Sequence, residues 1–206
     1  MIIPARVPRF IQKLYPGRVW RIESPSNELF LTFDDGPHPD ITPRVLDLLN
    51  EYNAKATFFC IGDRVKQYPT VVEQILAAGH TIGNHTQHHL NGWKTPAQEY
   101  VNDVAEAQGL IKTTLFRPPY GRMTGYQARA IRALGLKIMM WNILSADYDQ
   151  DISPEDISKR VTESIENGSI VVFHDSEKAA VNMFFALTEL LKKASLQGFK
   201  FRALEY

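Results

Sequence analysis

The chain has 206 residues, enough for one domain of the α/β-barrel size and too few for two. It carries 23 Lys and Arg against 23 Asp and Glu, so its formal net charge is zero, and it lacks the basic surface that nucleic-acid binding needs. Hydrophobic residues make up 44% of the chain, an ordinary globular composition. The single cysteine, Cys60, excludes an intrachain disulfide.

The N-terminal stretch is basic, but no uninterrupted apolar run follows its charges. This argues against a signal peptide, and no stretch approaches the roughly 20 apolar residues of a membrane span. The sequence as written therefore predicts a cytoplasmic protein, and an extracytoplasmic one if a leader has been removed. It leaves the oligomeric state open.

From Leu31 onward, short apolar runs alternate with amphipathic stretches, which is the pattern of β/α units. Strands are expected at 30–33, 56–60, 80–84, 115–116, 137–141, 170–173 and 199–202. Helices are expected after Thr42, Tyr68, Thr95, Thr124, Ser153 and in the stretch around Leu187, with capping-box spacing at Thr95 and Thr124.

This order predicts an α/β fold: a distorted or incomplete (β/α) barrel of about seven parallel strands, with an open doubly wound sheet as the alternative. We expect one catalytic domain over residues 1–206, in which residues 1–27 form an N-terminal extension that packs on the barrel.

Residues with chemical function recur where the predicted strands end. In chain order they are Asp34 and Asp35, then His85 and His89, then Arg117, Asp147, His174 and Asp175. Both candidate architectures bring the carboxyl ends of parallel strands together, so these side chains are expected to share one site.

His85 and His89 are four residues apart, a spacing that places both on one face of a helical turn. Asp35, at the end of the first strand, adds a carboxylate. Two imidazoles and one carboxylate suit one divalent metal ion, Zn²⁺ first and Co²⁺, Mn²⁺ or Fe²⁺ as alternatives. Three protein ligands leave positions open for water and substrate, which is typical of a catalytic site.

Five segments in this order resemble the polysaccharide deacetylases of carbohydrate esterase family 4, the chitooligosaccharide deacetylase-like group. They are Thr32-Phe33-Asp34-Asp35-Gly36-Pro37, His85-Thr86-Gln87-His88-His89, Arg117-Pro118-Pro119-Tyr120-Gly121, Asp147-Tyr148 and Ile170-Val171-Val172-Phe173-His174-Asp175. The resemblance implies a distorted (β/α) barrel and metal-dependent hydrolysis of N-acetyl, or also O-acetyl, groups of a saccharide.

The resemblance also implies roles. Asp34 would be the general base, held by Arg117, and His174 the general acid, oriented by Asp147. Asp35, His85 and His89 would hold the metal, and the backbone N–H of Tyr120 would bind the oxyanion.

Two positions depart from the family pattern. Tyr148 stands where Trp is usual, and Phe173 stands before His174 where Leu is common. Both residues would contact the substrate. Phe173 would form a floor of the acetyl pocket that is bulkier than the usual Leu.

The expected partner is an acetylated glycan, and peptidoglycan, chitooligosaccharide, acetylxylan and a cytoplasmic saccharide precursor all stay open. The loops expected to contact the sugar are 62–67, 91–94 and 121–125, with Trp93 and Tyr120 as stacking residues.

Other functions fit the same residues less fully. The same machinery could hydrolyse a non-sugar amide. Two histidines and one carboxylate also occur in non-haem iron oxygenases, although these need neither a second aspartate nor an acid such as His174. A saccharide-binding protein without catalysis has no need for the complete set.

Overall fold

The structure, a computed structural model, describes residues 4–205, so the first three residues of the predicted N-terminal extension lie outside it. Its strands are β1 Glu28–Asp34, β2 Ala56–Cys60, β3 Thr81–Asn84, β4 Leu115–Phe116, β5 Lys137–Ile138, β6 Ile143–Leu144, β7 Ser169–His174 and β8 Lys200–Phe201. Its helices are α1 Arg9–Leu14, α2 Ile41–Glu51, α3 Gly62–Gln67, α4 Pro69–Ala77, α5 Ala97–Leu110, α6 Gly125–Ala133, α7 Pro154–Thr162 and α8 Ala180–Leu196, with a 3₁₀ turn η1 at Pro119–Gly121.

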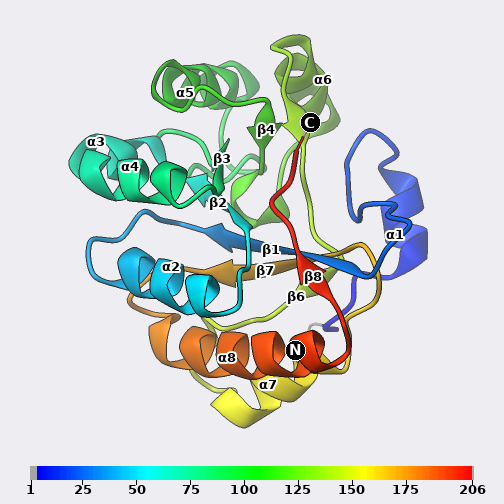
Figure 1. Cartoon of the computed structure of the whole chain (residues 1–206). Helices are drawn as coiled ribbons and strands as arrows, with labels where there is room; N and C mark the ends of the chain where they lie inside the picture. Colours follow the sequence, from blue (N-terminus) through cyan, green and yellow to red (C-terminus); the bar gives the residue numbers. More distant parts are fainter. Residues whose placement is uncertain (1–3, 206) are drawn as a thin grey trace.

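The strands form one parallel sheet in the order β5-β4-β3-β2-β1-β7-β6, and the short β8 pairs with the first residues of β1. The sheet curls into a half-barrel, and β1 and β7 run side by side through its centre (Figure 1). The predicted distorted or incomplete barrel of about seven parallel strands is confirmed. All carboxyl ends of a parallel sheet lie at one edge, which brings the polar residues that follow the strands together.

The central strands are buried along almost their whole length. In β2 all five residues are buried, and in β7 all except the last. On one face of the sheet, Phe33 stacks on Phe58 at 4.9 Å and on Phe173 at 6.0 Å between ring centroids. These rings belong to the largest core cluster, which also contains the inner faces of α2, α7 and α8. Continuous apolar runs are what a parallel sheet covered by helices requires.

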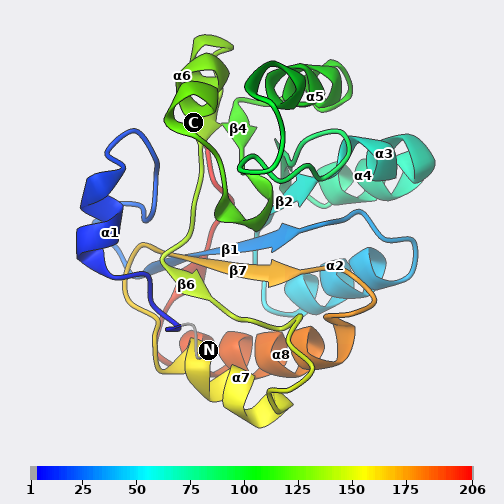
Figure 2. The same ribbon diagram turned by 180° about the vertical axis from the view of Figure 1, so that it is seen from behind.

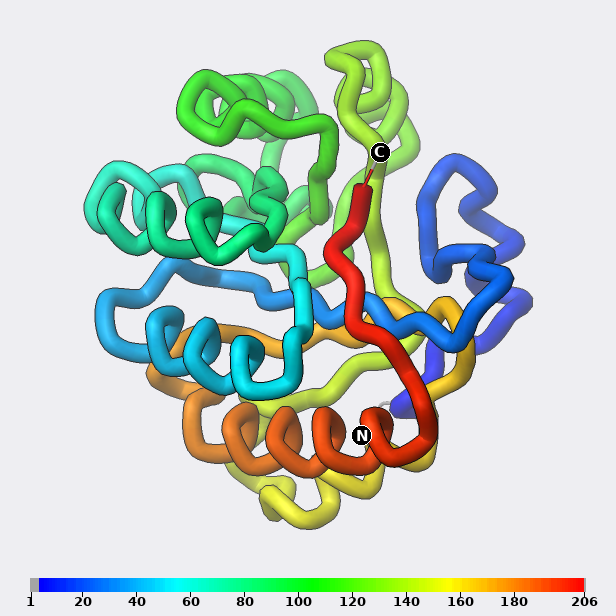
Figure 3. The backbone as a smooth tube through the Cα atoms, in the orientation of Figure 1, coloured from blue at the N-terminus to red at the C-terminus, as the bar shows by residue number. Residues whose placement is uncertain are grey.

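The segment before β1 crosses the sheet edge. Single bridges join Arg6 to Ile143, Val19 to Met139 and Arg21 to Ser169. Its helix α1 stands apart from the helices that cover the sheet (Figures 1 and 2). Figure 3 traces the last segment of the chain from α8 past β1 towards α6. Among residues 4–205, no helix has the length and apolar composition to cross a membrane.

Two of the predicted helix starts have the expected caps. Thr124 and Gln127 exchange both bonds of a capping box at α6, and the Ser153 hydroxyl accepts from the N–H of Asp156 at α7. The capping box expected at Thr95 is wrong. The cap position of α5 is Pro96, and the Thr95 hydroxyl donates to the carbonyl of Asn91 instead, because the helix begins one residue later than the motif requires.

The sequence prediction misplaced two other segments. Residues 62–67, expected as a loop, form α3. The expected strand 137–141 ends at Ile138 as β5, and a separate strand, β6, follows at Ile143–Leu144. A run of apolar residues does not reveal where one strand ends and the next begins.

Candidate active site

Three potential metal ligands meet at the carboxyl edge of the sheet. The Nε2 atoms of His89 and His85 lie 3.0 Å and 3.6 Å from the same carboxylate oxygen of Asp35. One ligand atom from each residue lies within 4.8 Å of the other two. His85 is 2% exposed, whereas His89 and Asp35 are partly open to solvent, so the cluster has a closed side and an open side.

The loop geometry differs from the helical turn expected for the two histidines. His85 follows β3 directly, and Thr86 and His89 have φ angles of 67° and 57° in the left-handed region, so the chain turns twice between the ligands. Asp35 is also left-handed, with φ 77°. Such backbone conformations cost energy in residues other than glycine and persist only where surrounding contacts enforce them.

Asp103, a buried residue of α5, supplies such contacts. Its carboxylate accepts hydrogen bonds from the backbone N–H of Gln87 at 2.9 Å and of His88 at 3.2 Å, and from Nδ1 of His88 at 2.5 Å. On the other side, the N–H of Gly62 donates to the carbonyl of Thr86. The loop that carries His85 and His89 is therefore fixed between α3 and α5.

The donor set fits a divalent cation. Nδ1 of His85 donates to the carbonyl of Arg117 at 2.8 Å, which turns Nε2 towards Asp35 and leaves it available to bind a metal ion. Two imidazole acceptors and a carboxylate that face one another need a cation between them. Burial opposes ionisation of Asp35, but its contacts with His85 and His89 and the nearby charge of His174 outweigh it and keep the Asp35 pKa well below its usual range. The cluster is thus ionised and oriented as a metal site requires.

The carboxylate of Asp34, next to this cluster in the sequence, contacts a buried arginine. Nη1 of Arg117 donates to Oδ1 of Asp34 at 2.7 Å and to the Thr32 hydroxyl at 2.7 Å. The other guanidinium nitrogens donate to the carbonyls of Met139 and Met140. Arg117 has no exposed surface, and every acceptor around it is fixed by the sheet or by the segment after β5. The predicted contact between Arg117 and Asp34 is therefore confirmed.

Asp147 and His174 form a second pair. Oδ1 of Asp147 accepts from Nδ1 of His174 at 2.7 Å, and Oδ2 accepts from the His174 backbone N–H at 2.8 Å. Asp147 follows β6, which pairs with β7, and not the strand at 137–141 that the sequence indicated. Burial acts to lower the pKa of His174, but the charge and hydrogen bond of Asp147 outweigh it and raise that pKa to about 9. The imidazolium is therefore stable at neutral pH.

One cavity of about 730 Å³ connects the candidate metal cluster with the pair of Asp147 and His174. Asp35, His89 and His174 lie in its wall. Tyr120 and Tyr148 also line it. The ring of Tyr120 lies 4.7 Å from that of His89, and the ring of Tyr148 stands perpendicular to His174 at 5.1 Å. Both tyrosines are thus placed to contact a molecule bound beside the metal ligands.

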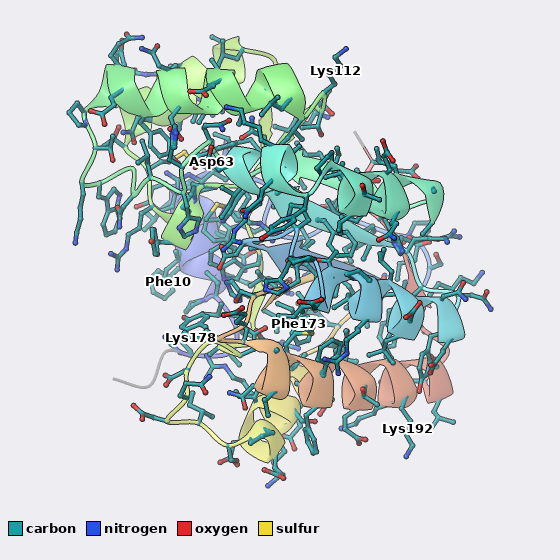
Figure 4. The ribbon with its side chains drawn as sticks, turned by 90° about the vertical axis from the view of Figure 1, so that its left-hand side faces the viewer. Phe10, Asp63, Lys112, Phe173, Lys178 and Lys192 are labelled. Carbon is teal, nitrogen blue, oxygen red and sulfur yellow. The ribbon has the colours of Figure 1, made fainter. Side chains whose placement is uncertain are left out.

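Phe173 does not take part in this cavity, and the expectation that it forms the floor of the acetyl pocket is wrong. Its side chain has no exposed surface and belongs to the core above α8 (Figure 4). Side chains alternate along a strand, so His174 and Val172 face the cavity while Phe173 faces the helices. Trp93, expected as a stacking residue, lies outside the cavity lining and is exposed beside Arg122.

Sequence reasoning placed Asp175 at the end of a strand but did not predict its contacts with Thr42 and Gly36. Asp175 is 1% exposed and accepts a short hydrogen bond from the Thr42 hydroxyl. A Cβ atom at Gly36 would come within 2.2 Å of this carboxylate, so only glycine fits there. Burial, together with the nearby charges of Asp35 and Asp34, raises the pKa of Asp175 to about 8. No local pattern marks these contacts, because they join residues far apart in the chain.

Comparison with known proteins agrees with this geometry. A family profile described as polysaccharide deacetylase matches residues 21–139, which is more than half of the chain. The chain belongs to the polysaccharide deacetylase family.

Individual relatives of this polysaccharide deacetylase extend the match. A peptidoglycan-N-acetylglucosamine deacetylase of Bacillus cereus is 35% identical over 187 residues, which are 87% of this chain and 88% of the relative. A chitooligosaccharide deacetylase of Azorhizobium caulinodans is 32% identical, with 77% and 79% covered. A solved peptidoglycan N-acetylglucosamine deacetylase, in complex with 4-naphthalen-1-yl-N-oxidanyl-benzamide, superposes with a TM-score of 0.87 at 28% identity, covering 96% of this chain and 95% of that one.

As a polysaccharide deacetylase of carbohydrate esterase family 4, the chain is a hydrolase that acts on non-peptide carbon–nitrogen bonds and removes acetyl groups from a glycan. Family membership thus favours the hydrolase over the oxygenase that the same three ligands suggest. The cluster of Asp35, His85 and His89 is consistent with the metal site of such an enzyme.

Proposed function

We propose that this deacetylase hydrolyses the N-acetyl group of N-acetylglucosamine units in a glycan of the peptidoglycan or chitooligosaccharide type, with Zn²⁺ at Asp35, His85 and His89. The observation that carries the proposal is that one cavity is lined by Asp35 and His89 of this cluster and by His174, which is paired with Asp147. A divalent cation at this site supplies Lewis acidity to the acetyl carbonyl and lowers the pKa of water.

In this proposal Asp34 receives the proton of the attacking water. Its carboxylate is suited to the role because Arg117 fixes one oxygen at 2.7 Å and leaves the other without a bond to that guanidinium. The backbone N–H of Tyr120, in the turn that follows Arg117, stabilises the negative charge that develops on the acetyl oxygen.

His174 acts as the general acid. Breaking the carbon–nitrogen bond expels an amine that must take up a proton. His174 carries that proton on Nε2, because its Nδ1 is bonded to Asp147. The raised pKa, about 9, keeps the imidazole charged at neutral pH. Tyr148 packs against the same ring and lines the cavity, so it contacts the sugar that leaves as the amine.

Acetate release from a panel of acetylated glycans tests the proposal. Chitotetraose, peptidoglycan fragments and acetylxylan are compared after loading the chelated protein with Zn²⁺, Co²⁺ or no metal. We expect metal-dependent release from the first two substrates and little from the O-acetylated xylan. Release from simple acetanilides at the same rate as from chitotetraose would instead make the enzyme a general amide hydrolase. An Asp34→Asn variant serves as the inactive control.

A further inference from the structure

The cavity beside the catalytic groups continues well beyond the space that an acetyl group needs. Its volume of about 730 Å³ lies within the range of roughly 300–1,000 Å³ that is typical of sites that bury most of a small ligand. The polar residues that line it are those of the catalytic centre, with Arg122 and Lys178. Its remaining wall is apolar and includes Val7, Pro8, Ile11, Trp20, Met140 and Leu144.

Half of this apolar wall comes from the segment before β1, and that segment is held firmly against the sheet. The N–H of Val7 donates to the carbonyl of Asn142, and the N–H of Leu144 donates to the carbonyl of Ala5. Arg6 donates through Nε to the carbonyl of Ser164 and contacts Glu166 at 3.4 Å. The wall is thus a fixed part of the fold, built by pairing across more than 130 residues of chain.

The aliphatic side chains that make up most of this wall are a poor surface for the hydroxyl groups of a second sugar ring, while its two tryptophans, Trp20 and Trp141, offer apolar faces to either ligand. Hydroxyl groups placed against valine, isoleucine, methionine and leucine side chains lose hydrogen bonds to water and gain none, which is unfavourable. A hydrocarbon chain placed there gains from the removal of apolar surface from water. Binding energy from such a remote group also lowers the barrier at the reacting bond when it fixes the substrate in place.

We propose that the apolar wall binds a hydrocarbon chain attached to the acetylated sugar, so that the preferred substrate is a saccharide of the proposed type that is linked to a lipid. This inference rests on the proposed deacetylase function and adds the class of its substrate. The hydrocarbon chain lies along Val7, Ile11 and Leu144, and the acetyl group lies beside Asp35 and His174.

Matched glycosides test this inference. The methyl, phenyl and octyl β-glycosides of N-acetylglucosamine carry the same acetyl group and differ only in the aglycone. With the metal-loaded enzyme, below the concentration at which the octyl glycoside forms micelles, kcat/KM should rise at least about tenfold from methyl to octyl. Each methylene that enters the cavity contributes roughly fourfold.

Two variants and one control locate the effect. Ile11→Asn and Val7→Asn should each lower the octyl-to-methyl ratio of kcat/KM towards one. Phe10→Asn alters the neighbour of Ile11 on α1, a residue that is 67% exposed and outside the cavity lining. In Figure 4, Phe10 lies on the same side of the molecule as Lys178. This control should leave the ratio unchanged. Melting temperatures within a few degrees of the wild type establish that each variant is folded.

Three outcomes would overturn the inference. They are equal kcat/KM for the methyl and octyl glycosides, a higher value for phenyl than for octyl, and a gain on lengthening the acyl group from acetyl to butanoyl without a gain on lengthening the aglycone. A failure of the proposed function looks different, because then neither glycoside nor chitotetraose releases acetate although the protein binds its metal.

Discussion

The two halves of the site are built in different ways. The candidate metal-ligand half, Asp35, His85 and His89, lies on loops with left-handed backbone angles, and hydrogen bonds that one of these loops donates to Asp103 of α5 hold it in place. The acid half, Asp147 and His174, follows two neighbouring strands, and the register of β6 with β7 brings the pair together. The first half depends on contacts outside the sheet, and the second on the sheet itself. Substitutions should therefore affect them separately.

Removing a metal ligand should have the largest effect. Asp35→Asn and His89→Ala are expected to lose bound metal and activity together, because two remaining protein ligands hold a catalytic ion poorly. Metal content by atomic emission, measured beside acetate release, checks this. An active His85→Ala/His89→Ala double variant with full metal occupancy would contradict the assignment.

Substitutions of the proton-transfer groups should separate catalysis from metal binding. Asp34→Asn and His174→Ala should each lower kcat by about 10²- to 10⁴-fold, the range typical of a general base or acid, while metal content stays near that of the wild type. Wild-type kcat in Asp34→Asn would show that Asp34 is not the base.

Asp103 offers a way to weaken the metal half without touching a ligand. Asp103→Ala removes the acceptor for the N–H groups of Gln87 and His88, so the histidine loop loses its fixed shape. Metal affinity should fall about 10- to 100-fold, as for other groups that orient ligands. Titration with Co²⁺, followed by its visible absorption, measures the affinity directly.

Glu106→Ala is the matched control for Asp103, because Glu106 lies on the same helix but is exposed and pairs with Lys66 at 3.1 Å. Its Co²⁺ affinity should equal that of the wild type. Equal losses in both variants would mean that α5 stability, and not the loop contact, controls metal binding.

The acid half should respond to pH. His174 must be protonated to donate, and Asp147 raises its pKa to about 9, so activity is expected to fall as pH rises through that value. Asp147→Asn removes the charge, and burial then holds the pKa at or below the ordinary value of about 6.5. The alkaline limb of kcat/KM should move to lower pH, with a loss of roughly tenfold at about pH 7.5.

A profile of kcat/KM from about pH 5 to about pH 10 for both forms decides this point. Metal content should stay unchanged. If Asp147→Asn lowers the melting temperature and leaves the limb in place, Asp147 shapes only the turn before Tyr148.

The sequence predicted the two halves of the site to different extents. The contact between Asp147 and His174 was predicted correctly, although Asp147 follows β6 and not the strand that the sequence indicated. Each residue comes after an apolar run, and the carboxyl ends of neighbouring strands lie together in a parallel sheet. The spacing of His85 and His89 predicted that both would lie in one candidate metal cluster with Asp35, but not their backbone, which is irregular where a helical turn was expected. Phe173 was misplaced because the motif alone does not say which way a strand residue points.

The apolar wall of the cavity was not predicted at all. Val7 and Ile11 meet Leu144 only in the folded chain, and no spacing within the sequence announces a contact between segments so far apart. Local patterns predict elements and their ends, whereas the partners of an irregular segment depend on the assembled sheet.

The surroundings of Arg117 make activity a measure of complete folding. Its side chain donates to acceptors on Thr32, Asp34, Met139 and Met140, which belong to segments more than 100 residues apart. These acceptors come together only after the sheet has assembled from β1 to β5. A partly assembled chain whose three metal ligands have already met still has an unoriented base. Refolding experiments should therefore find that metal uptake precedes the return of hydrolysis, and the interval between them reports the closure of this edge of the sheet.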